Sequence, residues 1–125
     1  MDVKTIQKQL SDFADERDWN QFHNPKNLAM ALSVEASELV EIFQWLTPEQ
    51  SEEIMSTNEG EHVKEELADV MIYLIRLADK LNIDLEDAVT DKIVKNGEKY
   101  PVDTSKGNTT KHTTLKEKIK GLIEL

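Results

Sequence analysis

Residues 27–45 read NLAMALSVEASELVEIFQW, and residues 61–81 read EHVKEELADVMIYLIRLADKL. In both stretches apolar residues recur at three- and four-residue spacing, which predicts two long helices. The first stretch is apolar on nearly all sides, so we expect it to be buried. Each stretch also carries two acids three positions apart, which makes them neighbours on a helix surface. These pairs are Glu35 with Glu38 and Glu66 with Asp69.

The remaining expected elements are shorter. Thr47-Pro48-Glu49-Gln50 has the pattern of an N-cap, a proline at the first helical position and a capping-box glutamine. Pro25 disfavours helix at the residue before it, which predicts a loop over residues 19–26. Further helices are expected over residues 2–18, 48–56 and 85–98, with Asp2 and Asp84 as N-caps.

The C-terminal part differs in composition from the rest of the chain. Residues 102–114 are polar and rich in threonine, so we expect a loose segment there. Residues 115–123 carry one apolar face, which predicts a short helix that packs on the bundle or on a second subunit. The sequence therefore predicts an all-α fold of the four-helix-bundle type with an extra short C-terminal helix. Residues 1–100 would form the domain and residues 101–125 its tail.

Composition excludes several classes of function. The chain has 25 acidic residues against 15 lysines and arginines, and the resulting net charge of −10 repels nucleic-acid polymers. It has no cysteine, so disulfides, thiolate catalysis and cysteine-based zinc sites are excluded. The longest apolar run, residues 70–75, is far too short to span a bilayer. We therefore expect a cytoplasmic protein whose partners include neither a membrane nor a nucleic-acid polymer.

The four paired acids project from the apolar stripes of the two long helices, and this position is costly. Burial of an unpaired carboxylate raises its pKa until the group is neutral, unless a cation compensates the charge. Mg²⁺ prefers oxygen ligands from carboxylates, water and substrate phosphates. Two acid pairs on facing helices therefore predict a divalent metal site, formed by Glu35, Glu38, Glu66 and Asp69.

Other interpretations of the acids remain open at this point. An acidic pair at this spacing is commonly a solvated helix face or part of a surface ion-pair network. A ferritin-like di-iron site requires Glu-x-x-His on two helices, and neither pair has a histidine at the fourth position. At the level of function, the rivals are a non-catalytic helical oligomerisation or interaction module and a metal-binding bundle with redox chemistry.

Glu35-x-x-Glu38, followed after 27 residues by Glu66-x-x-Asp69, resembles the signature of the MazG-like all-α nucleotide pyrophosphohydrolases. The resemblance covers about residues 3–112. Within the family, the flanking sequence is most similar to the dCTP pyrophosphatase branch. The segments that carry this likeness are FADERDWNQFHNPKNLAMAL (13–32), ELVEIFQW (38–45), EELADVMIYL (65–74) and KYP (99–101).

The resemblance implies a helical homodimer or homotetramer that hydrolyses a nucleoside triphosphate to the monophosphate and pyrophosphate. It implies Mg²⁺ as the cofactor, with Mn²⁺ as a substitute, and dCTP or a modified dCTP as the leading substrate for nucleotide pool cleansing. The four paired acids would hold the metal, and one of the glutamates would orient or deprotonate the attacking water. The substrate contacts that it implies are Trp19, His23, Trp45, Tyr73, Lys92, Asn96 and Tyr100.

The types of these residues suit a nucleotide. Aromatic side chains stack on nucleobases, and Tyr73 lies one helical turn from Asp69 on the same stripe. Lys92 and Asn96 lie one turn apart on a small basic face that suits phosphates. Core packing and solvated helix faces are the alternatives for these residues. Leu10 stands where members of the dCTP branch have a histidine that packs on the base, which leaves the choice of base open.

Overall fold

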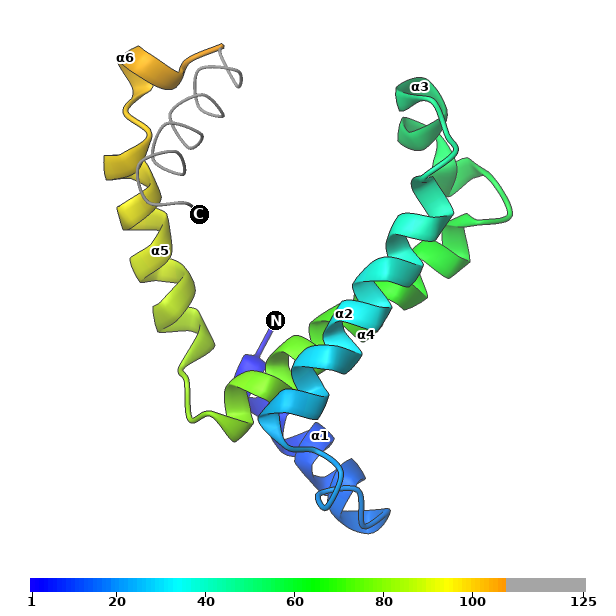
Figure 1. Cartoon of the computed structure of the whole chain (residues 1–125), viewed down its shortest axis with the longest axis vertical. Coiled ribbons are helices and arrows are strands. Elements are labelled where there is room, and N and C mark those ends of the chain that lie inside the picture. Colours follow the sequence, from blue (N-terminus) through cyan, green and yellow to red (C-terminus); the bar gives the residue numbers. More distant parts are fainter. Residues whose placement is uncertain (108–125) are drawn as a thin grey trace. The chain divides into compact units, whose positions relative to one another are not determined.

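The structure is a computed structural model that describes residues 1–107. These residues contain helices and no strand, which confirms the all-α prediction. None of their helices has both the length and the apolarity needed to cross a membrane. The expected helix over residues 115–123 lies outside the described residues. In chain order the helices are α1 (Val3–Glu16), α2 (Pro25–Phe43), α3 (Pro48–Glu52), the 3-10 helix η1 (Ile54–Ser56), α4 (Gly60–Lys80), α5 (Leu85–Lys99) and α6 (Val102–Ser105) (Figure 1).

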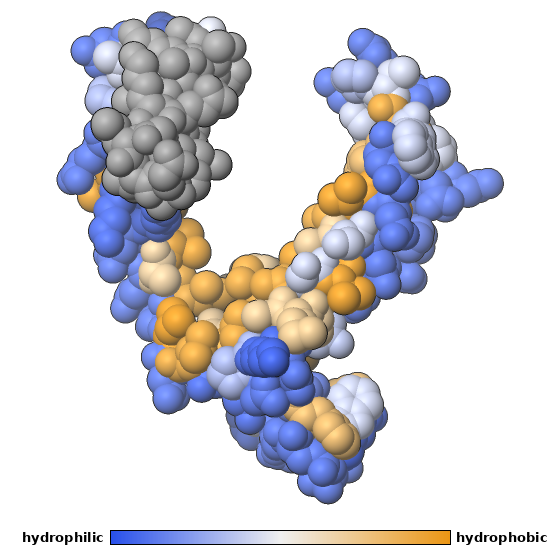
Figure 2. Space-filling model, viewed as in Figure 1, coloured by the Kyte–Doolittle hydropathy of each residue, from blue (hydrophilic) through white to orange (hydrophobic). Residues whose placement is uncertain are grey.

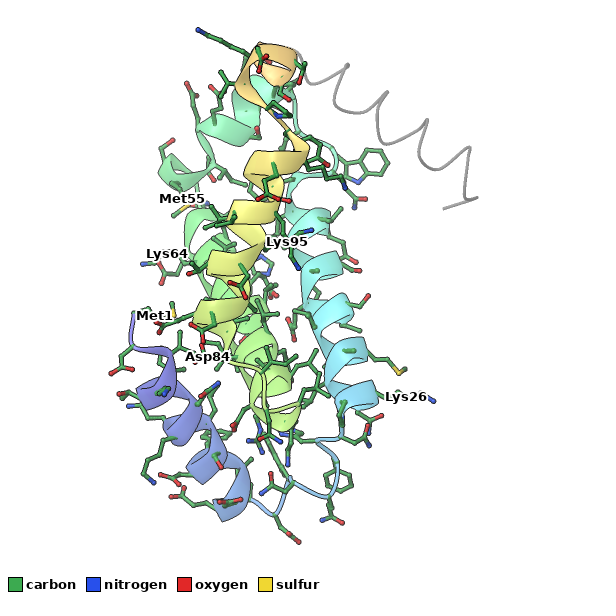
Figure 3. All side chains as sticks on the ribbon, turned by 90° about the vertical axis from the view of Figure 1, so that its left-hand side faces the viewer. Met1, Lys26, Met55, Lys64, Asp84 and Lys95 are labelled. Atoms are coloured by element: carbon green, nitrogen blue, oxygen red, sulfur yellow. The ribbon has the colours of Figure 1, made fainter. Side chains whose placement is uncertain are left out.

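The chain divides into two compact units, residues 1–85 and 86–125. In the first unit α4 is the central helix, because α1, α2 and η1 all pack against it. Helices α2 and α4 run antiparallel, with Lys26 near the start of α2 and Lys64 near the start of α4 at opposite ends of the pair (Figure 3). The second unit contains α5 and α6. The domain boundary expected at residue 100 stays a prediction.

The core of the first unit is small. Leu28 of α2 and Ile75 of α4 are fully buried, and a fully buried aliphatic side chain contributes about 1.5–3 kcal/mol. Gly60 begins α4 where the backbone passes close to η1, and a Cβ there would lie 2.9 Å from the carbonyl oxygen of Met55. Only glycine therefore fits without a shift of the backbone. The other buried apolar residues are Ala14, Ile54, Val63 and Ala78, and two charged residues, Glu66 and Arg76, are buried beside them.

The expectation that residues 27–45 form a buried helix is wrong for the chain by itself. Within α2 only Leu28 is buried, and Met30, Val34 and Val40 are 57%, 55% and 59% exposed. Apolar side chains are visible on the face of α2 turned to the viewer in Figure 2. The physical reason is that α2 packs one face against α4, and the other helices of the first unit leave most of its remaining apolar positions uncovered.

The helix starts follow the cap signals of the sequence. Asp2 Oδ1 accepts a hydrogen bond from the backbone N–H of Thr5 at 3.2 Å, which confirms the first N-cap. The capping box at Thr47 and Gln50 is also present. Helix α2 begins at Pro25, two residues before the expected start, because proline fits the first position of a helix. Asn24 caps this start and accepts from the N–H of Asn27 at 2.9 Å.

Helices α1 and α4 end with the same backbone motif. Asp18 and Asn82 have φ angles of 54° and 55°, in the left-handed region. The next residue in each case, Trp19 or Ile83, donates its N–H to a carbonyl five residues back at 2.9 Å. This is the hydrogen-bond pattern of a Schellman motif, which satisfies carbonyls that the helix end leaves free.

The start of the segment expected to be loose is helical. Helix α6 forms a single turn over Val102–Ser105. The carbonyl of Pro101 accepts hydrogen bonds from the backbone N–H groups of Thr104 and Ser105, at 3.2 and 3.0 Å. The Oγ1 of Thr104 donates to the same carbonyl at 3.2 Å. Polar composition does not prevent one helical turn, because a turn after a proline needs no buried apolar face.

Candidate active site

Three of the four paired acids come together where α2 packs against α4. Glu35 and Glu38 lie one turn apart on α2, and Glu66 lies on α4. One carboxylate oxygen from each of the three residues lies within 4.8 Å of the other two. Glu66 is buried, at 8% exposure, whereas Glu35 and Glu38 are half-buried. The packing of two helices thus creates a compact acidic cluster, which we define as Glu35, Glu38 and Glu66.

No lysine or arginine of the described residues pairs with this acidic cluster. Glu35 Oε2 and Glu66 Oε2 are buried and have no hydrogen-bond partner. The ion pairs that lysine and arginine form within residues 1–107 involve other acids. Buried polar atoms are almost always hydrogen-bonded, and a hard cation satisfies carboxylate oxygens in place of a donor. The donor set and its orphaned oxygens therefore fit a divalent cation.

The acidic cluster also changes the protonation of Glu35. The pKa of Glu35 rises from its usual value of 4.5 to about 7. Burial is the largest cause, and the neighbouring carboxylates of Glu66, Glu38 and Asp69 add to it. Burial and repulsion between crowded carboxylates both favour the neutral form of a carboxylic acid. A bound cation would remove this repulsion and displace the proton.

Asp69, the fourth paired acid, lies between the acidic cluster and an apolar pocket. It stands outside the group of three oxygens, but its charge is close enough to raise the pKa of Glu35. It is also part of the wall of a pocket of about 400 Å³ between α1, residues 19–23 and α4. We call this the ring pocket, and its lining consists of Leu10, Phe13, Ala14, Trp19, His23, Asp69, Ile72, Tyr73 and Arg76.

The ring pocket has an aromatic side that suits a flat ligand. Trp19 meets Phe13 edge to face, with ring centroids 5.6 Å apart, and lies 6.1 Å from the ring of His23. Trp19 remains 42% exposed, so part of its ring is accessible to a ligand. Leu10 and Tyr73 also line this pocket. If the acidic cluster holds a cation, the aromatic pocket beside it can take a molecule with a ring at one end and oxyanions at the other.

The polar end of the ring pocket includes Arg76, a residue to which the sequence analysis gave no role. Arg76 is 4% exposed and hydrogen-bonds across to the loop before α2, at Asn20 and His23. A signal was present, since Arg76 and Asp69 are the only charged residues within residues 67–78. Arg76 also lies one turn after Tyr73 on the same face. Its contacts with Asn20 and His23 could not be found from the sequence, because these two residues lie more than 50 positions away.

Several expected substrate contacts are not among the residues that line the ring pocket. Trp45 follows the end of α2 and is 87% exposed. Lys92, Asn96 and Tyr100 belong to the second unit, where the first two lie on α5 and the third directly follows it. Within that unit the Lys99 ammonium lies 5.5 Å from the ring centre of Tyr100. The roles of these four residues as substrate contacts stay predictions.

A wider hollow of about 650 Å³ is lined in part by the acidic cluster, through Glu38. His62 also lines it, and its Nε2 lies 3.5 Å from Glu66 Oε1. A hydrogen bond to Glu59, at 3.1 Å from Nδ1, raises the pKa of His62. His62 therefore joins the edge of the cluster, which its position four residues before Glu66 could have indicated. Glu41, Ile42 and Glu59 complete the lining.

Together, the fold and the site define an all-α protein in which two packed helices hold an acidic cluster, with donors that fit a divalent cation, beside a ring pocket. Comparison with known proteins gives the family. Residues 30–115 match the MazG-like family. The chain therefore belongs to the MazG-like family, and this confirms the resemblance inferred from the two acid pairs.

Individual relatives agree with this assignment. The dCTP pyrophosphatase 1 of Mus musculus is 42% identical over 114 residues, which cover 90% of this chain and 67% of the relative. The human dCTP pyrophosphatase 1 is 41% identical over the same shares of both chains. A pyrophosphatase from Archaeoglobus fulgidus has a solved structure that is similar with a TM-score of 0.75 and 42% identity. That similarity covers 81% of this chain and 94% of the other.

Proposed function

We propose that this protein hydrolyses a nucleoside triphosphate between the α and β phosphorus atoms and releases the monophosphate and pyrophosphate. The observation that carries the proposal is the acidic cluster with two unpartnered buried oxygens directly beside an aromatic pocket. Phosphoryl transfer needs mainly positioning and charge neutralisation. A site that binds a cation at one end and a ring at the other provides both.

The cofactor in this proposal is Mg²⁺, with Mn²⁺ as a substitute. Glu35, Glu38, Glu66 and Asp69 would hold it, and a bound divalent ion would neutralise phosphate charge and lower the pKa of a water molecule. The carboxylates that remain free of the ion would orient this water or accept its proton.

The substrate in this proposal is dCTP or a modified dCTP, and the role is nucleotide pool cleansing in the cytoplasm. Support comes from the relatives, which are named dCTP pyrophosphatase 1 and are 41–42% identical. The base would stack against Trp19 and Tyr73, which both line the ring pocket. Leu10 lines the same pocket and offers packing but no hydrogen bond to the base.

The assembled state in this proposal is a homodimer or homotetramer. The exposed apolar residues of α2 support it, because exposed apolar patches commonly mark interfaces. Residues 101–125 would form a tail that packs on the bundle or on a second subunit. In the assembled enzyme, the expected substrate contacts are completed by Trp45, Lys92, Asn96 and Tyr100.

The test is a product assay with each of the eight common nucleoside triphosphates, first with Mg²⁺ and then with EDTA. We expect monophosphate and pyrophosphate in equal amounts, lost with EDTA, and the highest kcat/KM with dCTP. Release of inorganic phosphate instead of pyrophosphate would contradict the bond that we assign. No hydrolysis of any triphosphate, together with no binding of Mg²⁺, would favour the non-catalytic interaction module.

A further inference from the structure

Arg76 is a buried cation in the wall of the ring pocket. Its side chain is 5% exposed, and three of its nitrogens have acceptors. Nε donates to His23 Nδ1 at 3.4 Å, Nη1 donates to Asp79 Oδ2 at 3.5 Å, and Nη2 donates to Asn20 Oδ1. A buried charge that lost these partners would be strongly destabilising. The guanidinium therefore ties α4 to the loop that carries Trp19 and His23.

A second cation reinforces this connection. Lys80, one turn after Arg76, donates to the same Asn20 Oδ1 at 3.2 Å. On its other side, the Asn20 amide nitrogen donates to Asp15 of α1. Asn20 thus links α1 to α4, and the loop between Trp19 and His23 is held from both helices. We call Asn20, His23, Arg76 and Lys80 the loop clamp.

The contact between Arg76 and His23 determines where the imidazole carries its proton. A guanidinium is always protonated and can only donate. His23 Nδ1 must therefore accept, which leaves the ring neutral with its proton on Nε2. The positive charge nearby has the same effect, since burial together with Arg76 and Lys80 lowers the pKa of His23. Asp69 of the pocket wall and Asp79 beside Arg76 are the acids close to this group.

We propose that Arg76 is a positioning residue for ring recognition, because it fixes His23 as the neutral Nε2–H form and so gives the ring pocket a preset hydrogen-bond donor. This donor suits an unprotonated acceptor on a flat ring, such as a carbonyl oxygen or a pyridine-type nitrogen. The inference rests on the proposed function only for the identity of the ring as a nucleobase. The Nε2–H donor of His23 would supply the polar contact to the base that Leu10 cannot make.

The first test measures the tautomer in the unsubstituted protein. Proton–nitrogen correlation spectra of the histidine side chains, assigned with His23→Gln, report which ring nitrogen carries the proton. We expect His23 to be neutral at pH 7 with a protonated Nε2, and to become a mixture of forms in Arg76→Met. The control is Lys64→Met, which removes a cation from the exposed start of the same helix. Protonation at Nδ1 in the unsubstituted protein would overturn the proposal.

The second test separates ring binding from general stability. In Arg76→Met we expect KM for the preferred triphosphate to rise about three- to tenfold, the worth of one hydrogen bond, with kcat changed less than twofold. The effect should not add to that of His23→Ala in the double variant, because both changes remove the same contact. Additive effects would show that Arg76 acts otherwise. If no triphosphate is hydrolysed, the proposed function fails, whereas the spectra still decide the tautomer.

Discussion

The two halves of α4 differ in whether a buried charged side chain has hydrogen-bond partners. In the first half, Glu66 is 8% exposed, lies among other carboxylates and has an oxygen without a partner. In the second half, Arg76 is 4% exposed, and three of its nitrogens donate to acceptors from two parts of the chain. The acidic cluster thus leaves buried oxygens without a partner, whereas the loop clamp provides acceptors for its own buried donors.

This difference separates the residues that serve function from the residues that serve stability. A buried polar group without a partner lowers stability by about 1–3 kcal/mol, so the acidic cluster destabilises the ligand-free fold. A buried charge with good partners stabilises the arrangement that surrounds it. Substitutions in the acidic cluster should therefore reduce function without loss of stability, and substitutions in the loop clamp should reduce stability.

The largest effect is expected for Glu66→Gln. Loss of one ligand should lower kcat/KM by at least about a hundredfold, since even groups that only support a ligand are worth 10–100-fold. Helix content by circular dichroism and the Tm without metal should not fall, because the change removes one of the crowded charges. The matched control is Glu65→Gln, an exposed neighbour on the same helix. Activity of Glu66→Gln within twofold of the unsubstituted protein would contradict the comparison.

The next effect concerns the loop clamp. Asn20→Ala removes the acceptor of Arg76 Nη2 and Lys80 Nζ, and it should destabilise the fold by about 2 kcal/mol. Urea unfolding, followed by circular dichroism, measures this change. Asn27→Ala provides the control, because its side chain donates only to the nearby carbonyl of Phe22. Equal losses in the two variants would mean that the loop clamp has no special role.

A smaller effect is expected from pH. The pKa of Glu35 is about 7 in the folded protein and near 4.5 when unfolded. Its contribution to stability is therefore complete below pH 4.5 and is lost as the pH rises through about 7. Without metal, Tm should fall between pH 5 and pH 8, and Glu35→Gln should flatten this fall. Mg²⁺ should raise Tm more at pH 8 than at pH 5, which thermal melts with Mg²⁺ or EDTA would measure. Equal Tm values with Mg²⁺ and with EDTA at both pH values would show that the cluster binds no cation.

The smallest effect tests the backbone alone and leaves both charged clusters intact. Asp18 has a left-handed φ of 54°, which glycine adopts without strain. Asp18→Gly should therefore stabilise the fold by roughly 0.5 kcal/mol, offset in part by greater freedom of the unfolded chain. Asn82→Gly should gain less, because asparagine tolerates this region better. Differential scanning calorimetry measures both, and destabilisation by Asp18→Gly would show that its side-chain contact with Gln21 matters more.

Much of the first unit could be predicted from the sequence, because its signals are local. The spacing of apolar residues located the long helices, and the caps at Asp2 and Thr47 located two starts. The acid spacing on two helices was enough to indicate a shared site, and Glu35, Glu38 and Glu66 do meet. The start of α2 was misplaced because Pro25 was taken only as a residue that ends helix before it.

What the sequence could not predict depends on which surfaces meet. An apolar helix face indicates that something covers it, but the periodicity does not say what, so α2 was expected to be buried and is not. Arg76 stood out as a charge in an apolar run, yet its role depends on His23, which lies 53 positions away. For the same reason, the sequence pattern around Trp45 or Lys92 does not show whether either residue lies near the substrate.

The spacing of side chains along α4 has a consequence for how this sequence can change. Glu66, Asp69, Tyr73 and Arg76 follow one another at intervals of three, four and three residues, so they share one face of a helix about 15 Å long between the first and the last. An insertion of one residue between Asp69 and Tyr73 would rotate the second pair by about 100° away from the first. A substitution on α4 therefore changes one of these side chains, whereas an inserted or deleted residue turns Glu66 and Asp69 away from Tyr73 and Arg76 together. We therefore expect length changes inside α4 to be rejected.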